Sequence, residues 1–150
     1  MKKIRPFLWF DDKAEEAANL YVSLFKNAKI LDVNRAGGDV RSVTFEIEGQ
    51  ELIAFNGGPH YKFTPAISLF VDCKSQREVD ELWNALTVGG EESRCGWLKD
   101  KYGLSWQIIP SVLIEMLNDD DDGKSGRVMQ AMLGMSKIDV EGLKQAYNRK

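Results

Sequence analysis

The sequence is poor in the residues that build metal centres and disulfide frameworks. Its 150 residues include two cysteines, Cys73 and Cys95, and a single histidine, His60. Two cysteines and one histidine do not have the spacing of a zinc site. So few cysteines suit a protein that is kept reduced, which favours a cytoplasmic location.

The sequence also lacks an excess of basic residues and any long apolar run. The net charge is −3 and the pI is near 5.3, whereas a general nucleic-acid binder needs a basic face. No apolar run approaches the roughly 20 residues that span a bilayer. Residues 1–6 have two lysines but neither the apolar length nor the cleavage site of a signal peptide. We therefore expect neither nucleic acid nor membrane as a partner.

What is present is the composition of an ordinary globular protein. Hydrophobic residues make up 43% and charged residues 29% of the chain. A chain of this length can bury roughly two thirds of its extended surface, which is enough for one core. We therefore predict a single domain over residues 1–150, of α+β class.

The first 58 residues are predicted to form a βαβββ module. An apolar strand over 4–10 precedes an Asp12–Glu15 motif with the spacing of a helix capping box. The helix that follows has an apolar face at 3.6-residue periodicity. Three further strands are predicted, separated by glycine-containing turns, over residues 29–35, 43–48 and 51–56.

The same pattern returns 61 to 63 residues later. Residues 69–72 echo residues 8–11, and Ser75–Glu78 is a second capping box before another apolar helix face. The second module spans 64–110 and ends in strands over 91–99 and 104–109. Two such modules can pair their sheets into a curved wall around a shared cleft, and we predict this arrangement.

A turn and a helical tail complete the pattern. Asp100 and Gly103 have the spacing of a tight turn, in which Asp bonds the following backbone and Gly accepts positive φ. Residues 111–150 show helical periodicity and form a predicted helical tail. The four carboxylates of 119–122 are interpreted as a solvated helix N-terminus, because they lack the alternate spacing of a calcium loop.

Strand alternation selects the candidate binding residues. It places Ser105, Gln107 and Ile109 on one face of the last strand, and Trp106 and Ile108 on the other. Gln107, together with Ser68 and Asn56, could orient a ligand within an apolar pocket. Some of the aromatic residues could line that pocket, but core or inter-module packing is the better explanation for most of them.

The cysteines and the histidine are further candidates for a functional role. The Cys95 thiol could face the cleft, or the residue could be a small buried hydrophobe. Cys73, at a strand end, is interpreted as structural. His60 could act as a base, but its position in a linker favours an exposed surface histidine.

Five motifs together resemble a known family. They are residues 14–17 before Tyr21, 55–59, 63–71, 95–100 and 105–108. With these motifs the sequence is similar to the PhnB-like branch, often named demethylubiquinone methyltransferase-like, of the glyoxalase/bleomycin-resistance/dioxygenase (vicinal oxygen chelate) superfamily. The resemblance covers nearly the whole chain, and the helical tail at 127–135 also fits.

The resemblance implies the paired-module fold, but not the metal site. Enzymes of the superfamily bind a divalent metal through His, Gln or Glu at the starts of the first strands and the ends of the last strands. Here those places carry Pro6, Ala66 or Ile67, Asn56 and Gln107. A lone amide at Gln107 cannot hold a divalent ion that requires several donors. We therefore expect no metal and no cofactor.

The methyltransferase name also lacks a matching motif. Most S-adenosylmethionine enzymes have a glycine-rich turn after the first strand of a doubly wound sheet. Here Asp11 and Asp12 follow the first strand instead.

We therefore expect a homodimeric, metal-free protein that binds a small aromatic or apolar metabolite in the cleft. The alternatives are a methyltransferase-like enzyme for a quinone-type substrate, a metal-dependent lyase or dioxygenase, and a sequestering module. The candidate cleft residues are Gln107, Ser68, Asn56, Phe10, Phe55, Cys95 and Trp97.

Overall fold

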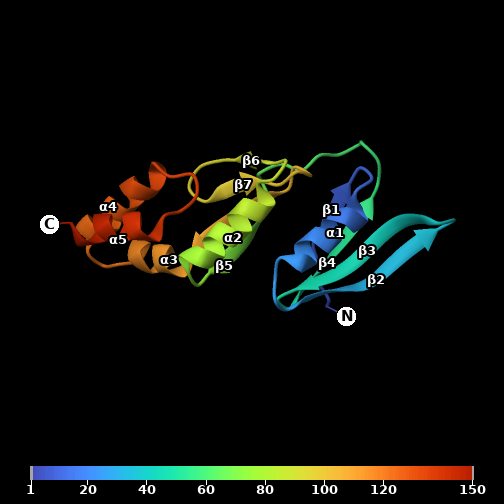
Figure 1. The fold of residues 1–150 in the computed structure, drawn as a ribbon, viewed down its shortest axis with the longest axis horizontal. Helices are drawn as coiled ribbons and strands as arrows, with labels where there is room; N and C mark the ends of the chain where they lie inside the picture. The colour runs from blue at the N-terminus through green and yellow to red at the C-terminus, as the bar shows by residue number, and fades with distance from the viewer. Residues whose placement is uncertain (1, 150) are drawn as a thin grey trace. The chain divides into compact units, whose positions relative to one another are not determined.

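The computed structural model describes residues 2–149, which form two compact units, with the boundary along the chain between Phe63 and Thr64. Each unit contains one four-stranded mixed sheet. The fold is α+β, as the sequence predicts (Figure 1). None of the described helices has the length and apolar character to cross a membrane.

The first unit is a βαβββ module. Its sheet has the order β1-β4-β3-β2, with β1 parallel to β4 and the other pairs antiparallel. Helix α1 packs on one face of this sheet (Figure 1). The elements are β1 (Phe7–Phe10), α1 (Ala14–Ser23), β2 (Ala28–Ala36), β3 (Asp39–Ile47) and β4 (Gln50–Asn56).

Period-two alternation explains which side of this sheet is buried. Leu8 and Phe10 of β1 are buried, whereas Phe7 and Trp9 between them are not. The buried strand residues and the apolar face of α1 form the core of the unit. Removing this apolar surface from water stabilises the fold by about 0.8 kcal/mol per buried CH₂. This core consists of Leu8, Phe10, Ala14, Ala17, Ala18, Tyr21, Val43, Phe45, Leu52 and Ala54.

The predicted capping box at Asp12 is wrong. Lys13 is the N-cap residue of α1, and no side chain of that position caps the helix. The backbone N–H of Ala14 donates instead to Oδ1 of Asn56 at 2.8 Å. An amide at the end of β4 therefore accepts from the first helical N–H of α1, a donor that the predicted box at Asp12 did not involve.

The second unit repeats the module. Its sheet has the order β5-β8-β7-β6, with β5 parallel to β8, so the predicted repeat is confirmed in strand order and direction. Ser75 caps α2 by accepting from the N–H of Glu78 at 3.1 Å, as predicted. The elements are β5 (Ser68–Cys73), α2 (Gln76–Leu86), β6 (Glu91–Glu92), β7 (Trp97–Lys99) and β8 (Ser105–Pro110).

The predicted continuous strand over 91–99 is also wrong. It is interrupted between β6 and β7 by a turn in which the N–H of Trp97 donates to the carbonyl of Arg94 at 3.0 Å. Both central residues of the turn have positive φ, 58° at Cys95 and 85° at Gly96. A β ladder cannot pass through two such residues, because strand residues have strongly negative φ.

The tail is helical, as predicted, and belongs to the second unit. It comprises α3 (Ser111–Leu117), α4 (Asp122–Leu133) and α5 (Val140–Asn148). Asp121 caps α4 by accepting from the N–H of Lys124, which confirms the interpretation of the acidic run as a helix N-terminus. The tail core is built on the end of β8 and contains Ile109, Leu113, Met116, Val128, Ile138 and Leu143.

Candidate functional site

The face of the second sheet that carries Gln107 combines polar and aromatic side chains. The Nε2 of Gln107 donates to Oγ of Ser68 at 3.0 Å. The strand neighbours of Gln107 are Phe70 in β5 and Trp97 in β7, and paired residues point to the same side of a sheet. We call Ser68, Phe70, Trp97 and Gln107 the Gln107 face.

A buried hydroxyl without a partner lies beside this face. Ser105 is two residues before Gln107 and pairs with Ser68 in the strand register. Its side chain is 1% exposed, and its Oγ has no hydrogen-bond partner among the described residues. An unsatisfied buried hydroxyl is costly, and such a group is an available donor and acceptor for a ligand. Sequence reasoning placed Ser105 on this side but did not select it.

The turn between β7 and β8 holds the opposite side of β8 in place. The carboxylate of buried Asp100 accepts from the backbone of Tyr102 at 2.9 Å and of Leu104 at 3.1 Å. It also accepts from Nε1 of Trp106 at 2.9 Å. This arrangement confirms the predicted Asp-x-x-Gly turn, with Gly103 at φ 88°. Because Trp106 is fixed on the buried side, Gln107 is fixed on the other side.

In the first unit, aromatic rings pack on the side of the sheet opposite α1. Trp9 contacts Phe55 and Tyr61 edge-on, with ring centroids 5.1 and 4.9 Å apart, and Phe7 lies 5.2 Å from Phe55. The indole N–H of Trp9 donates to the carbonyl of Gly58 at 2.9 Å. Phe7 remains 56% exposed and Tyr61 68%. We call Phe7, Trp9, Phe55 and Tyr61 the aromatic face.

Two sequence-predicted site residues lie on the side of the first sheet that α1 covers. Phe10 is buried and packs its ring edge-on against Phe63 at 5.2 Å. Asn56, its strand partner, caps α1 and donates to the carbonyl of Val40 at 3.1 Å. The structure therefore places Gln107, Ser68 and Trp97 together, and Phe55 on the aromatic face. It places Phe10 and Asn56 behind that face.

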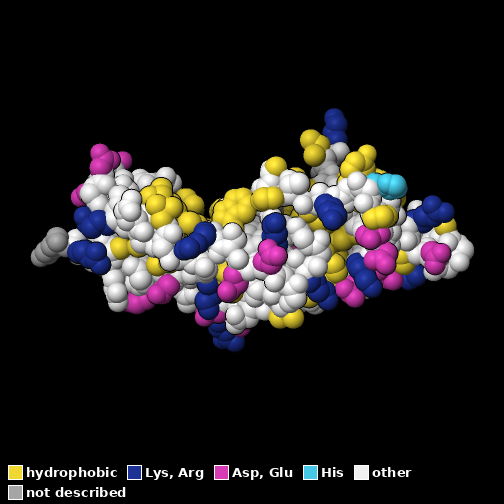
Figure 2. Space-filling view, turned by 90° about the horizontal axis from the view of Figure 1, so that it is seen from above, with side chains coloured by type: hydrophobic (Ala, Val, Ile, Leu, Met, Phe, Trp, Pro, Cys, Tyr) yellow, Lys and Arg dark blue, Asp and Glu magenta, His cyan; other side chains and the backbone are white. Residues whose placement is uncertain are grey.

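The cysteines and the histidine differ in surroundings. Cys73 is fully buried, and burial together with nearby Glu78 raises the pKa of its thiol to about 12, so it stays protonated. This agrees with a structural role. Cys95 is half-buried in the turn before Trp97. His60 is exposed, as predicted, and the histidine is visible at the surface in Figure 2.

Metal-binding residues do not converge in the part of the chain that the structure describes. No group of three or more His, Cys, Asp or Glu side chains there is arranged to hold a metal ion. The donor set around Gln107 consists of one amide and two hydroxyls, which does not fit the N, S and carboxylate ligands of catalytic metals.

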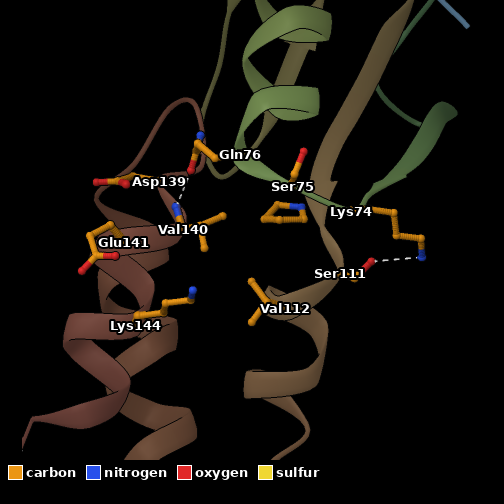
Figure 3. A pocket seen from close by; sticks show the side chains of 10 residues that line it. Lys74, Ser75, Gln76, Ser111, Val112, Asp139, Val140, Glu141 and Lys144 are labelled. Atoms are coloured by element: carbon orange, nitrogen blue, oxygen red, sulfur yellow. Dashed lines mark hydrogen bonds between the residues drawn. The ribbon is translucent and has the colours of Figure 1, made fainter.

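A surface pocket of the second unit lies elsewhere, where α2, α3 and α5 begin. It has a volume of about 460 Å³. Figure 3 shows Lys144 of α5 and Val112 of α3 on either side of it, with Gln76 of α2 reaching Val140. Near it, Lys74 and Ser111 both bond the carboxylate of Asp72 and hold its pKa below the ordinary value.

With this geometry described, the chain can be compared with known proteins. A family model described as 3-demethylubiquinone-9 3-methyltransferase matches residues 2–109. The chain belongs to this family. The solved PhnB protein from Bacillus cereus is 36% identical, with a TM-score of 0.69, and the match covers 73% of this chain and 99% of that one. A comparison with curated proteins returned no match.

More distant structures share the fold of this family member. A protein from Pseudomonas aeruginosa is 19% identical, with a TM-score of 0.61, over 73% of this chain and 98% of that one. The fosfomycin resistance protein FosX from Listeria monocytogenes is 17% identical, with a TM-score of 0.50, over 71% and 89%. The fold is that of the glyoxalase/bleomycin resistance superfamily, as the sequence motifs predict.

The matched region ends where the tail begins. The family model stops at residue 109, and β8 ends at Pro110. Both sheets, the Gln107 face and the aromatic face therefore lie within the family region.

Proposed function

We propose that this family member binds a small aromatic or apolar molecule without a metal ion, and that the Gln107 face supplies the contacts that orient it. One observation carries the proposal: Gln107 lies between Phe70 and Trp97 in the sheet and is hydrogen-bonded to the hydroxyl of Ser68. Small-molecule sites commonly combine apolar walls with a few convergent polar groups.

The polar groups suggest the chemistry of the ligand. Gln107 and the unpartnered hydroxyl of Ser105 offer both donors and acceptors, so they suit a carbonyl or hydroxyl oxygen on a ring. The rings of Trp97 and Phe70, the latter 52% exposed, suit the apolar part of the same molecule. We also propose that Cys95, in the turn before Trp97, contacts the ligand. In the first unit, Phe10 and Asn56 support from behind the aromatic face that contains Phe55.

Ligand-observed NMR with phenols, hydroquinones and aromatic ketones tests this proposal. Gln107→Leu removes the polar group at nearly constant volume and should weaken binding of a bound probe about tenfold, since an unpaired polar group costs roughly 1–3 kcal/mol. Gln145→Leu changes an exposed residue of α5 and is the matched control. This variant should bind the probe with unchanged affinity. Unchanged affinity in Gln107→Leu would rule out the chosen site.

Metal-free binding has its own test. Elemental analysis of protein purified without chelator or metal-affinity tag should give no stoichiometric divalent metal. One zinc, iron or manganese ion per chain would contradict this part of the proposal.

A second candidate is methyl transfer to a quinone-type substrate, which only the description of the matched family favours. Titration of S-adenosylmethionine in a calorimeter discriminates between the two functions. We expect no heat of binding, and saturable binding would favour the enzyme.

We further propose a cytoplasmic homodimer. Its two cysteines are free, and apolar side chains are exposed in both units, including Phe7 at 56% in the first and Leu133 at 51% in the second. Figure 2 shows such hydrophobic side chains in several groups at the surface. Light scattering at micromolar concentration should give twice the chain mass of 17.0 kDa, and a monomer mass would refute dimerisation.

A further inference from the structure

We infer that residues 135–140 of the tail act as a clamp that holds the 94–97 turn and thereby positions Trp97 on the Gln107 face. This inference rests on the proposed function, because it concerns the control of the same site. It assigns a positioning role to a tail that lies beyond the matched family region.

The first observation is that the turn has an unfavourable residue at its centre. Cys95 has φ 58°, in a region where the side chain of an L-residue crowds the backbone. Positions of this kind favour glycine, asparagine or aspartate. A cysteine remains there only if contacts outside the turn hold the backbone in place.

The tail supplies those contacts. The N–H of Cys95 donates to the carbonyl of Met135, and the N–H of Gly96 donates to that of Ser136, both at 2.8 Å. A Cβ added at Gly96 would lie 2.7 Å from Cδ1 of Ile109 and 3.2 Å from Cγ1 of Ile138. The turn therefore packs closely against Ile109 of β8 and Ile138 of the clamp, and a side chain at position 96 would not fit.

The clamp is itself anchored on α2. The side-chain amide of Gln76 donates to the carbonyl of Ile138 at 2.9 Å and accepts from the N–H of Val140 at 2.7 Å. Figure 3 shows the contact with Val140 at the first turn of α5. Lys137 adds an ion pair with Asp80 of α2 at 3.0 Å. One glutamine thus bonds the backbone of the clamp on both sides of residue 139.

The position of Trp97 depends on this chain of contacts. Trp97 follows Gly96 directly, and the carbonyl of Gly96 accepts from the N–H of Ile108 at 2.8 Å. Trp97 then pairs with Gln107 in the strand register. When the clamp leaves the turn, the turn loses two of its hydrogen bonds, and Trp97 loses its fixed place beside Gln107.

Thiol alkylation of the full-length chain without ligand tests the clamp. Gln76→Ala should raise the rate of iodoacetamide modification at Cys95 by about five- to thirtyfold, the change expected when one or two hydrogen bonds no longer oppose opening. Peptide mass spectrometry separates Cys95 from Cys73. Because Cys73 is fully buried, its rate reports general unfolding and should stay unchanged.

Tyr147→Phe is the matched control. It removes the 2.5 Å hydrogen bond between Tyr147 and Asp119 in the tail but leaves the clamp intact. It should leave the Cys95 rate unchanged. The clamp is refuted if Gln76→Ala leaves the Cys95 rate unchanged, if Cys73 and Cys95 accelerate together, or if both variants have the same effect.

Hydrogen exchange of the unmodified protein provides a second measurement that needs no variant. The amides of Cys95 and Gly96 should be protected and should exchange together with tail amides such as Leu143. Unprotected amides at both positions would refute the clamp even if Gln76→Ala failed to fold. Neither readout uses a ligand, so a failed ligand screen would count against the proposed function alone.

Discussion

The two sheets have the same strand order, but the sides that face away from their helices differ in chemistry. In the first unit this side holds Phe7, Trp9 and Phe55, whose rings pack against one another. In the second it holds the amide of Gln107, which lies between Phe70 and Trp97 and bonds the hydroxyl of Ser68. A repeated topology therefore does not imply a repeated site.

The interactions that hold the corresponding helices and turns in place also differ between the two units. Helix α2 is capped by Ser75 from its own loop, whereas α1 is capped by Asn56 from a strand 42 residues away. The turn before β8 depends on the Asp100 carboxylate, whereas the turn before β4 passes through Glu48 and Gly49, both at positive φ. Substitutions at matched places in the two units test how far this difference extends.

The largest effect is expected at the turn before β8. Asp100→Ala removes the buried carboxylate that accepts from the backbone of Tyr102 and Leu104 and from the indole N–H of Trp106. We expect the free energy of unfolding to fall by about 4 kcal/mol, because bonds to charged groups contribute roughly 1.5–3 kcal/mol each and are not additive. Urea unfolding followed by tryptophan fluorescence measures this, and a loss below about 1 kcal/mol would contradict it.

The two helix caps should differ in the same way. Asn56→Ala should cost about 2 kcal/mol, because it removes the cap of α1 and a bond to Val40. Ser75→Ala removes a single cap bond and should cost about 1 kcal/mol. Thermal unfolding of both variants gives the comparison, and equal losses would show that the long-range cap has no additional role.

A smaller effect depends on pH. The bonds from Lys74 and Ser111 lower the pKa of Asp72 from its ordinary value of 3.8, so the ionised carboxylate stabilises the fold. That contribution is present above pH 3.8 and is lost as the pH falls through the lowered pKa. Asp72→Asn should therefore cost about 0.5 kcal/mol at pH 7, because the pair is exposed, and less as the pH falls below 3.8 and through the lowered pKa. A constant difference across this pH range would exclude this linkage.

The last expected effect, of similar size, is an increase in the free energy of unfolding. Glu48 and Cys95 are the non-glycine residues with positive φ among those the structure describes, and each precedes a glycine. Glu48→Asn places a better residue at the exposed turn before β4 and should raise the free energy of unfolding by about 0.5 kcal/mol. Chemical denaturation measures this gain, and a loss of stability would show that the Glu48 side chain has a role that its backbone conformation does not reveal.

The fold was predictable from the sequence because its periodic signals are local. The 61- to 63-residue offset and the alternation in each strand identified both modules, and the Asp100 turn was correctly placed. The capping box at Asp12 failed because α1 begins one residue later, with Lys13 as N-cap, and the distant Asn56 bonds its first N–H. The strand over 91–99 failed because Met135 and Ser136 stabilise a turn that local propensity does not favour.

The candidate site was predictable only where alternation determined it. Gln107 and Ser68 were both selected as candidates, and the structure brings them together because they lie on parallel neighbouring strands. Phe10 and Asn56 were selected by residue type. Strand alternation was applied to β8 but not to β1, where it would have placed Phe10 on the same side as buried Leu8. Ser105 was not selected because an unpaired hydroxyl becomes evident only when its surroundings are known.

The order of the strands affects how the nascent chain can fold. In each sheet the strand made last lies between the strand made first and the one made third. The β2–β3 hairpin can close early on the ribosome, but β1 has no neighbour to pair with until β4 emerges. Each half of the protein must therefore keep its first strand unpaired during synthesis. These two strands are the segments most exposed to aggregation and most in need of chaperone binding.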